Sequence, residues 1–304
     1  MRSRLAEINP ALAKLDLLAA DATDPTSLRA VAEAARVVIT TVGPYIHHGE
    51  ALVAACAQAG TDYVDLCGEP EFVDRIYLRH HATAVTTGAR LVHCCGFDSI
   101  PYDLGVYFTV KQLAEGVPLK VEGFVSASAT FSAGTIYSAV TASSRLRSSA
   151  KLARQRRKDE GRPVDRKVRQ LLGVPRHAKK LGAWVLPAPT IDPRIVLRSA
   201  RALERYGPEF SYGHYLSIKK LRIAVGLVGG ALALVALSQV PPARNWLLRR
   251  KKPGDGPTPD GLMRGSRSGW GKCMPIMQDD HILNLYRCLR PGRSRCCTTA
   301  APVR

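Results

Sequence analysis

The feature that most constrains the fold is a repeated alternation of two residue periods between Leu17 and Val110. Short apolar or β-branched runs, typical of strands, alternate with longer segments whose apolar residues recur at helical spacing. This alternation predicts a doubly wound α/β fold built on a parallel sheet. Ligands in such sheets bind at the carboxyl ends of the strands, so the residues that follow each strand are the first candidates for a site.

The predicted elements of this region can be placed on the chain. Gly60 and Gly88 are good helix ends, and Pro70 is a good helix start. The continuous β-branched run at 37–42 predicts a strand buried on both faces. The predicted strands occupy residues 17–21, 37–42, 62–66 and 90–95, and the predicted helices 24–35, 49–60, 70–88 and 99–113.

After Gly116 the pattern changes to a period of two, "LKVEGFVSASATFSAGT", which is typical of a strand in an antiparallel sheet. A later segment, 183–203, reads as a loop, a strand and a helix. The sequence therefore predicts a first domain at 1–115 and a second α+β domain at 116–258. Residues 259–304 show no sustained period and are expected to be disordered.

The formal net charge is +19, and its excess lies mainly in the basic segment 145–180 and near the C-terminus. Such clusters suit an anionic membrane surface, RNA or simply a solvated face. Residues 223–242 carry no charge and are flanked by basic residues on both sides. This apolar segment fits a membrane span, a membrane-surface helix or a buried core helix.

The cysteines and the start of the chain give predictions about metal binding and cellular location. The eight cysteines show neither CxxC pairs nor metal-like spacing, so no metal site is predicted. The first residues lack the apolar run of a secretory signal, which favours the cytoplasm.

The turn "VGPY" after the second predicted strand is the main candidate site. Gly43 has no Cβ and Pro44 fixes the backbone path, so a flat ring could approach closely. Tyr45 could stack on that ring or hydrogen-bond to it. Asp21 follows an earlier strand and could lie near the adenine part of a dinucleotide. A plain turn and a cap are the structural alternatives.

Six further polar residues can be explained by a local structural role. One of His47 and His48 could donate a proton near neutral pH, although such a pair can also simply begin a helix. Ser99, like Asp98 before it, precedes Pro101 and suits helix capping. Glu69 reads as an exposed loop acid or a pocket residue, and His93 as a core residue.

Two long stretches carry a family resemblance, "TTVGPYIHHGEALVAACAQAGTDYVDLCGEPEF" and "GARLVHCCGFDSIPYDLGVY". They closely resemble the saccharopine dehydrogenase-like family, nearest to the branch that contains the bacterial trans-acting enoyl reductases. "FSAGTIYSAV" and "APTIDPRIVLRSARAL" extend the resemblance, which runs from about residue 15 to about residue 258. It implies an incomplete Rossmann-like NAD(P)-binding domain followed by a substrate domain.

The resemblance also implies a reaction and a set of site residues. The reaction is NAD(P)H-dependent reduction of a carbon–carbon double bond in a lipid or polyketide acyl substrate, which could be carrier-bound, as in glycolipid synthesis. Tyr45 and His48 would be the catalytic candidates. The residues implied to contact NADP or NAD are Asp21, Val42, Gly43, Pro44, Tyr45, Gly96, Phe97 and Asp98.

The chain departs from the family pattern at both ends. Family members begin with a strand and a glycine-rich turn that holds the pyrophosphate, and this chain has no such turn. After "KPGDGPTPD" the resemblance stops. The chain is thus expected to be a fragment of such an enzyme, a non-catalytic remnant, or a basic membrane-associated protein. The expected location is the cytoplasm, with association with the plasma membrane and self-association as further expectations; no nucleic acid is expected.

Overall fold

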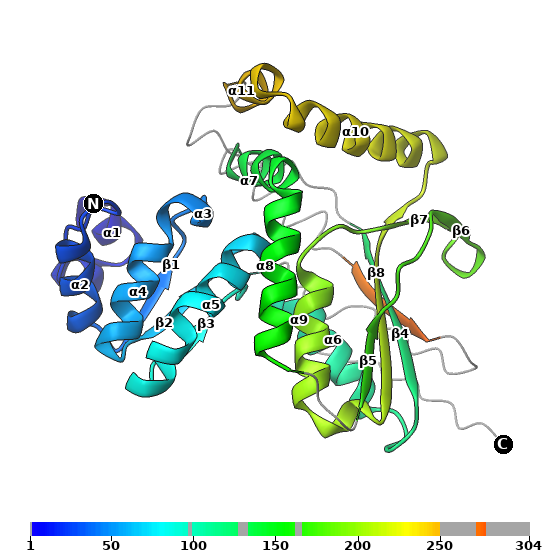
Figure 1. Ribbon diagram of the computed structural model, residues 1–304, viewed down its shortest axis with the longest axis horizontal. Coiled ribbons are helices and arrows are strands. Elements are labelled where there is room, and N and C mark those ends of the chain that lie inside the picture. Colours follow the sequence, from blue (N-terminus) through cyan, green and yellow to red (C-terminus); the bar gives the residue numbers. More distant parts are fainter. Residues whose placement is uncertain (1, 97–98, 127–132, 162–165, 250–271, 278–304) are drawn as a thin grey trace. The chain divides into compact units, whose positions relative to one another are not determined.

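The computed structural model describes residues 2–96, 99–126, 133–161, 166–249 and 272–277 (Figure 1). The chain forms two compact units, Met1–Val64 with Leu78–Val92, and Asp65–Tyr77 with His93–Arg304. The division therefore falls inside the segment 1–115 that the sequence groups as one domain.

The first unit contains a three-stranded sheet in the order β1-β2-β3. β2 and β3 pair in parallel, with Tyr63 opposite Leu91 and Val64 opposite Val92. This sheet with its helices confirms the predicted parallel α/β fold. Its strands are β1 (Val37–Thr40), β2 (Asp62–Asp65) and β3 (Leu91–Val92). The helices along this part of the chain are α1 (Arg2–Ile8), α2 (Pro25–Ala34), α3 (Tyr45–His48), α4 (Glu50–Ala59) and α5 (Pro70–Thr87). A short 3-10 turn at Pro10–Lys14 lies between α1 and α2.

The helix ends follow the signals in the sequence. α2 begins at Pro25, and the Asp24 side chain before it accepts hydrogen bonds from the N–H groups of Thr26 and Ser27. α4 ends at Gly60, whose φ of 75° lies in the left-handed region. Gly88 follows α5 with a φ of 80°. The predicted helix boundaries in this region are therefore confirmed.

Two strand predictions are wrong. Residues 17–21 form no strand, and Leu18 is 62% exposed. In β1, burial alternates instead of covering both faces, because Val38 and Thr40 are buried while Ile39 is 75% exposed. A β-branched run fixes the extended backbone, but burial depends on what packs against each face.

The second unit is built on a mixed sheet in the order β6-β7-β8-β4-β9. β4 pairs in parallel with β8 and antiparallel with β9. The first half of β8 also pairs in parallel with β5, and its second half pairs antiparallel with β7. The antiparallel expectation for the strand after Gly116 is therefore right on one side only. The strands are β4 (Leu119–Ser126), β5 (Lys167–Gln170), β6 (Arg176–Ala178), β7 (Ala183–Pro187), β8 (Glu209–Ile218) and β9 (Lys272–Met277).

The strand β9 lies within the tail 259–304, for which the sequence predicts disorder. The rest of that tail is outside the described residues.

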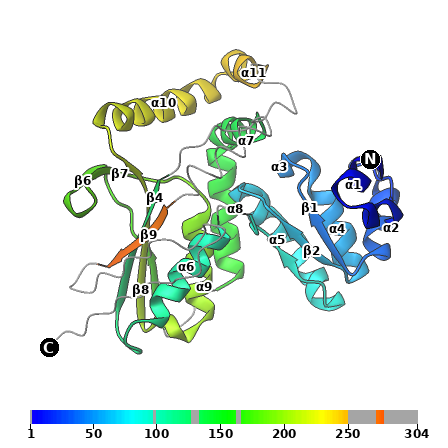
Figure 2. The same ribbon diagram turned by 180° about the vertical axis from the view of Figure 1, so that it is seen from behind.

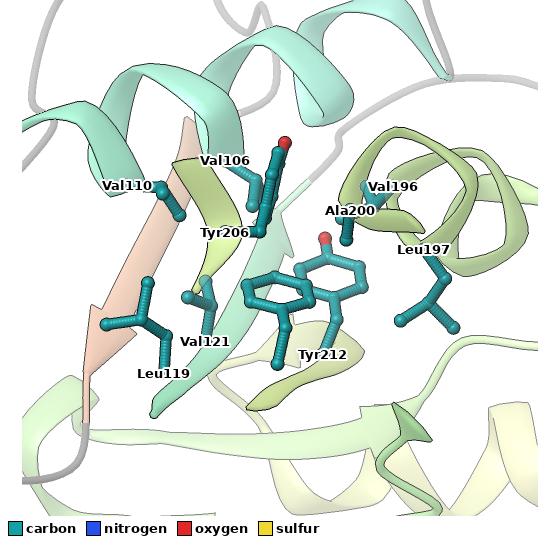
Figure 3. Close-up of a cluster of buried hydrophobic side chains, with 10 residues drawn as sticks. Val106, Val110, Leu119, Val121, Val196, Leu197, Ala200, Tyr206 and Tyr212 are labelled. Atoms are coloured by element: carbon teal, nitrogen blue, oxygen red, sulfur yellow. The ribbon is translucent and has the colours of Figure 1, made fainter. Parts of the chain in front are cut away.

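The core of the second unit lies between this sheet and two helices, α6 (Ile100–Lys111) and α9 (Asp192–Ala202) (Figure 3). Each helix contributes apolar side chains that meet the buried face of β4 and β8. The cluster consists of Val106, Val110, Leu119, Val121, Val196, Leu197, Ala200, Tyr206, Phe210 and Tyr212. Burial of these side chains is the main stabilising contribution in this unit.

The basic segment is partly neutralised by carboxylates at the start of α5. The helices here are α7 (Ala133–Ser144) and α8 (Leu146–Asp159). Arg145 forms two hydrogen bonds with Glu71, at 2.6 and 2.8 Å. Arg156 pairs with Asp74 at 3.1 Å and with Glu160 at 2.7 Å. These arginines therefore stabilise the packing of α8 and are not simply a solvated face.

The apolar segment forms α10 (Leu221–Gln239), followed by α11 (Pro241–Arg249). In length and composition α10 could cross a membrane. Only Ala224 and Ser238 in it are buried. The buried core helix, one of the three alternatives, does not match this exposure.

Candidate functional site

The turn after β1 has an exposed entry and a buried end. Val42 is 57% exposed, Gly43 is exposed, and the Gly43–Pro44 peptide is cis. Tyr45 opens α3 with its side chain buried, and its hydroxyl donates a 3.1 Å hydrogen bond to the Thr40 carbonyl. This bond ties the turn back to the end of its own strand.

His48 and Asp21 are both exposed in the first unit. His48 is the last residue of α3. The Asp21 carboxylate accepts hydrogen bonds from the backbone N–H and the hydroxyl of Thr23, at 2.8 and 2.7 Å. These bonds hold the pKa of Asp21 below its ordinary value. Its carboxylate thus shapes a local turn, in agreement with the structural alternative.

A buried polar pair follows the ends of β2 and β3. Asp65 is the last residue of β2, and His93 comes directly after β3. The distance from His93 Nδ1 to Asp65 Oδ2 is 2.6 Å, and both side chains are at least nine-tenths buried. The second carboxylate oxygen of Asp65 accepts hydrogen bonds from the N–H groups of Cys67 and Cys94. The Asp65 carboxylate therefore holds the imidazole in one orientation.

The side chains near this pair are also buried. The His93 ring meets the Phe72 ring edge to face, with centroids 5.6 Å apart. Glu69 is buried and accepts a 3.0 Å hydrogen bond from the Ser138 hydroxyl, so its interpretation as an exposed loop acid is wrong. Burial raises the pKa of the Cys67 and Cys94 thiols. These cysteines are therefore neutral thiols and poor nucleophiles.

The glycine after the cysteine pair lies close to the neighbouring loop. A Cβ on Gly96 would stand 3.0 Å from Leu66 Cβ, so this position favours glycine. Phe97 and Asp98 lie outside the described residues. Val42, Gly43, Pro44, Tyr45 and His48 thus belong to the first unit, and Gly96 to the second.

A second polar cluster joins the starts of α6 and α9 to β8. Ser99 occupies the predicted cap position of α6, but its hydroxyl donates to Asp192 at 2.8 Å instead of capping the helix. His214 Nε2 lies 3.6 Å from Asp192, and His214 Nδ1 shares a 2.9 Å hydrogen bond with the Tyr212 hydroxyl. Burial raises the pKa of Asp192, although hydrogen bonds from Thr190 and Ser99 oppose this. The cluster is fully enclosed, which favours a structural role.

The residues present fit a nicotinamide ring better than a whole dinucleotide. The atoms nearest to a Cβ on Gly43 would belong to Tyr45, at 3.6 Å or more, so the exposed backbone there has room for contact with a flat ring. Within the described ranges, no strand is followed by a glycine-rich turn of the kind that holds a pyrophosphate. The same ranges contain no group of three metal-ligating side chains.

Comparisons with known proteins identify relatives of this chain among named oxidoreductases. The chain is 38% identical over 275 residues to a Mycobacterium tuberculosis protein provisionally named a trans-acting enoyl reductase, covering 82% of this chain and 65% of that protein. It is 35% identical over 206 residues, 64% of the chain and 44% of the relative, to a protein of Arabidopsis thaliana provisionally named a mitochondrial saccharopine dehydrogenase-like oxidoreductase. The trans-acting enoyl reductase of Mycobacterium leprae is 47% identical over 115 residues, 38% of the chain and 28% of that protein.

No family model and no solved structure matches the chain. The α/β fold and the named relatives together define an oxidoreductase class. The chain belongs to the saccharopine dehydrogenase-like family, on the branch of the trans-acting enoyl reductases. It spans 65% of the length of the first of these relatives.

Sequence reasoning missed the Asp65–His93 pair and assigned His93 to the core. The two residues are 28 positions apart and meet because β2 and β3 pair in parallel. The predicted strand 90–95 places His93 in its middle, whereas the observed β3 ends at Val92 and leaves His93 at the carboxyl end of the strand, where ligands of such sheets bind.

Proposed function

We propose that this chain takes part in a nicotinamide-dependent reduction of a carbon–carbon double bond in an acyl substrate of lipid or polyketide synthesis. The main support for this proposal is the Mycobacterium tuberculosis relative named as a trans-acting enoyl reductase, which is 38% identical over 82% of the chain. The substrate would be a thioester, bound to a carrier or free, and the reaction would take place in the cytoplasm, at the plasma membrane. Either NADPH or NADH could serve.

The proposed chemistry needs one hydride and one proton. A bound reduced nicotinamide supplies the hydride that forms the new bond at the β-carbon. The electron pair of the double bond then moves to the α-carbon, where the adjacent carbonyl stabilises the charge until a proton arrives. Asp65 accepts the Nδ1–H of His93, so a protonated His93 can give its other proton, on Nε2, to the α-carbon. In total, one double bond is reduced, and one NAD(P)H and one proton are consumed.

The proposal is tested with the purified full chain. Oxidation of NADPH or NADH should be followed with and without an enoyl thioester, and coenzyme binding should be measured separately by fluorescence. We expect oxidation that depends on the thioester. A folded chain that binds neither coenzyme would rule out the activity for this chain.

The role of His93 is tested by substitution. His93→Gln should lower kcat by about 10²- to 10⁴-fold, the contribution of a general acid, and leave coenzyme binding unchanged. His177→Gln, a change at an exposed histidine on β6, is the matched control and should keep full activity. If His93→Gln keeps full activity while Tyr45→Phe or His48→Gln loses it, the acid is one of those two residues and not His93.

A further inference from the structure

α10 carries apolar side chains on all sides and exposes most of them. A helix that is apolar all round belongs either in a protein core or in lipid. The first alternative fails here, because only two of its residues are buried. Its exposed large apolar side chains, 37–67% accessible, are Leu221, Ile223, Val225, Leu227, Val228, Leu232, Val235 and Leu237.

One side of α10 is held by the protein. α10 contacts α7, which lies beneath the end of α10 that leads into α11 in both views (Figures 1 and 2). Gln239 at its end donates a 2.8 Å hydrogen bond to the Ser143 carbonyl of α7. The Ser238 hydroxyl donates to the Val235 carbonyl, so this polar group is also satisfied. The helix is thus fixed in place with its outward apolar side uncovered by the described residues.

The charged side chains around α10 are all positive. Lys219, Lys220 and Arg222 stand at its start, and Arg244 and Arg249 lie on α11 just after its end. From Phe210 to Gly254 the sequence contains no aspartate or glutamate. Trp246, an aromatic residue of the type enriched at membrane interfaces, is 51% exposed on α11. Basic residues at both ends of an apolar helix match an anionic lipid surface.

We propose that α10 binds the interface of an anionic bilayer, lying in its plane with the outward apolar side among the acyl chains. The basic residues at its two ends would then contact lipid phosphates on the same side of the membrane. A spanning helix would place these two basic clusters on opposite sides and separate α10 from α7. This membrane surface does not depend on the reductase proposal.

The test is co-sedimentation of the full chain with vesicles of phosphatidylcholine, with and without phosphatidylglycerol. We expect binding to the anionic vesicles that weakens with salt. Leu232→Asp, on the most exposed apolar side chain of α10, should weaken binding at least about tenfold, because a charged side chain is strongly disfavoured within the apolar region of the bilayer. The control Leu172→Asp changes an 89% exposed leucine of a surface loop and should bind like the wild type.

Both variants should fold, because neither leucine lies in the core, and circular dichroism checks this. Absence of vesicle binding by the folded wild type, or equal binding by Leu232→Asp, would overturn the proposal. Retention through an alkaline carbonate wash would indicate a spanning helix and overturn the interfacial assignment. A wild-type dimer that becomes a monomer in Leu232→Asp, without vesicle binding, would assign this surface to a second copy of the chain.

Discussion

Gly123, in the middle of β4, makes room for the buried polar cluster of the second unit. A Cβ at this position would stand 2.5 Å from the Tyr212 hydroxyl oxygen and 3.5 Å from His214 Nδ1. Tyr212 is fully buried and its ring is rigid, so it cannot move aside easily. Glycine is therefore required for the Tyr212–His214 hydrogen bond, and through it for the contact with Asp192.

Gly123→Ala should destabilise the protein by about 1–3 kcal/mol, the usual cost of overpacking a core. Urea unfolding followed by circular dichroism measures the change. Gly105→Ala is the matched control, because Gly105 lies in α6 and a Cβ there would meet nothing within 4 Å. That variant should be at least as stable as the wild type, since alanine favours a helix by about 0.5–1 kcal/mol. Equal stability of Gly123→Ala and the wild type would contradict this account.

At the scale of elements, the contact between α5 and α8 depends on paired charges. Glu71 accepts two hydrogen bonds from Arg145 and one of 2.8 Å from Ser148. Burial tends to raise the pKa of Glu71, but the bonds from Arg145 and Ser148 outweigh it and hold that pKa below its ordinary value. A carboxylate with a lowered pKa stabilises the folded state above the unfolded pKa, and this contribution is lost as the pH falls through the folded value.

Arg145→Met should therefore cost about 1–2 kcal/mol at neutral pH, a modest value because Arg145 is partly exposed. The difference from the wild type should shrink below about pH 4, the region where an unpaired glutamate takes up its proton. Unfolding curves at neutral and acidic pH measure both effects. Arg147→Met, an exposed change on α8 itself, should leave stability nearly unchanged. A cost that is the same at every pH would argue against the role of Glu71.

At the scale of the whole molecule, the features that could be predicted from the sequence are those set by residues close together in the chain. The ends of α4 and α5 follow from Gly60 and Gly88, and the α/β class of the first unit follows from its alternating periods. Contacts between distant residues were not predictable in this way. Ser99 suits a cap by its position, but its bond goes to Asp192, 93 residues further on.

The candidate site shows the same limit. The turn at Gly43–Pro44 could be predicted as an exposed strand end, because glycine and proline act on their own backbone. The Asp65–His93 pair required knowledge of which strands are neighbours. The division of β8 between β5 and β7, and the exposure of α10, likewise depend on packing and not on local pattern.

The most direct test of the central claim is a single-turnover reduction of an enoyl thioester in D₂O, with mass spectrometry of the product. The coenzyme's hydrogen should be found at the β-carbon and deuterium at the α-carbon, and His93→Gln should form this product much more slowly. An unreduced thioester from folded protein with bound coenzyme, or equal rates for both proteins, would contradict it.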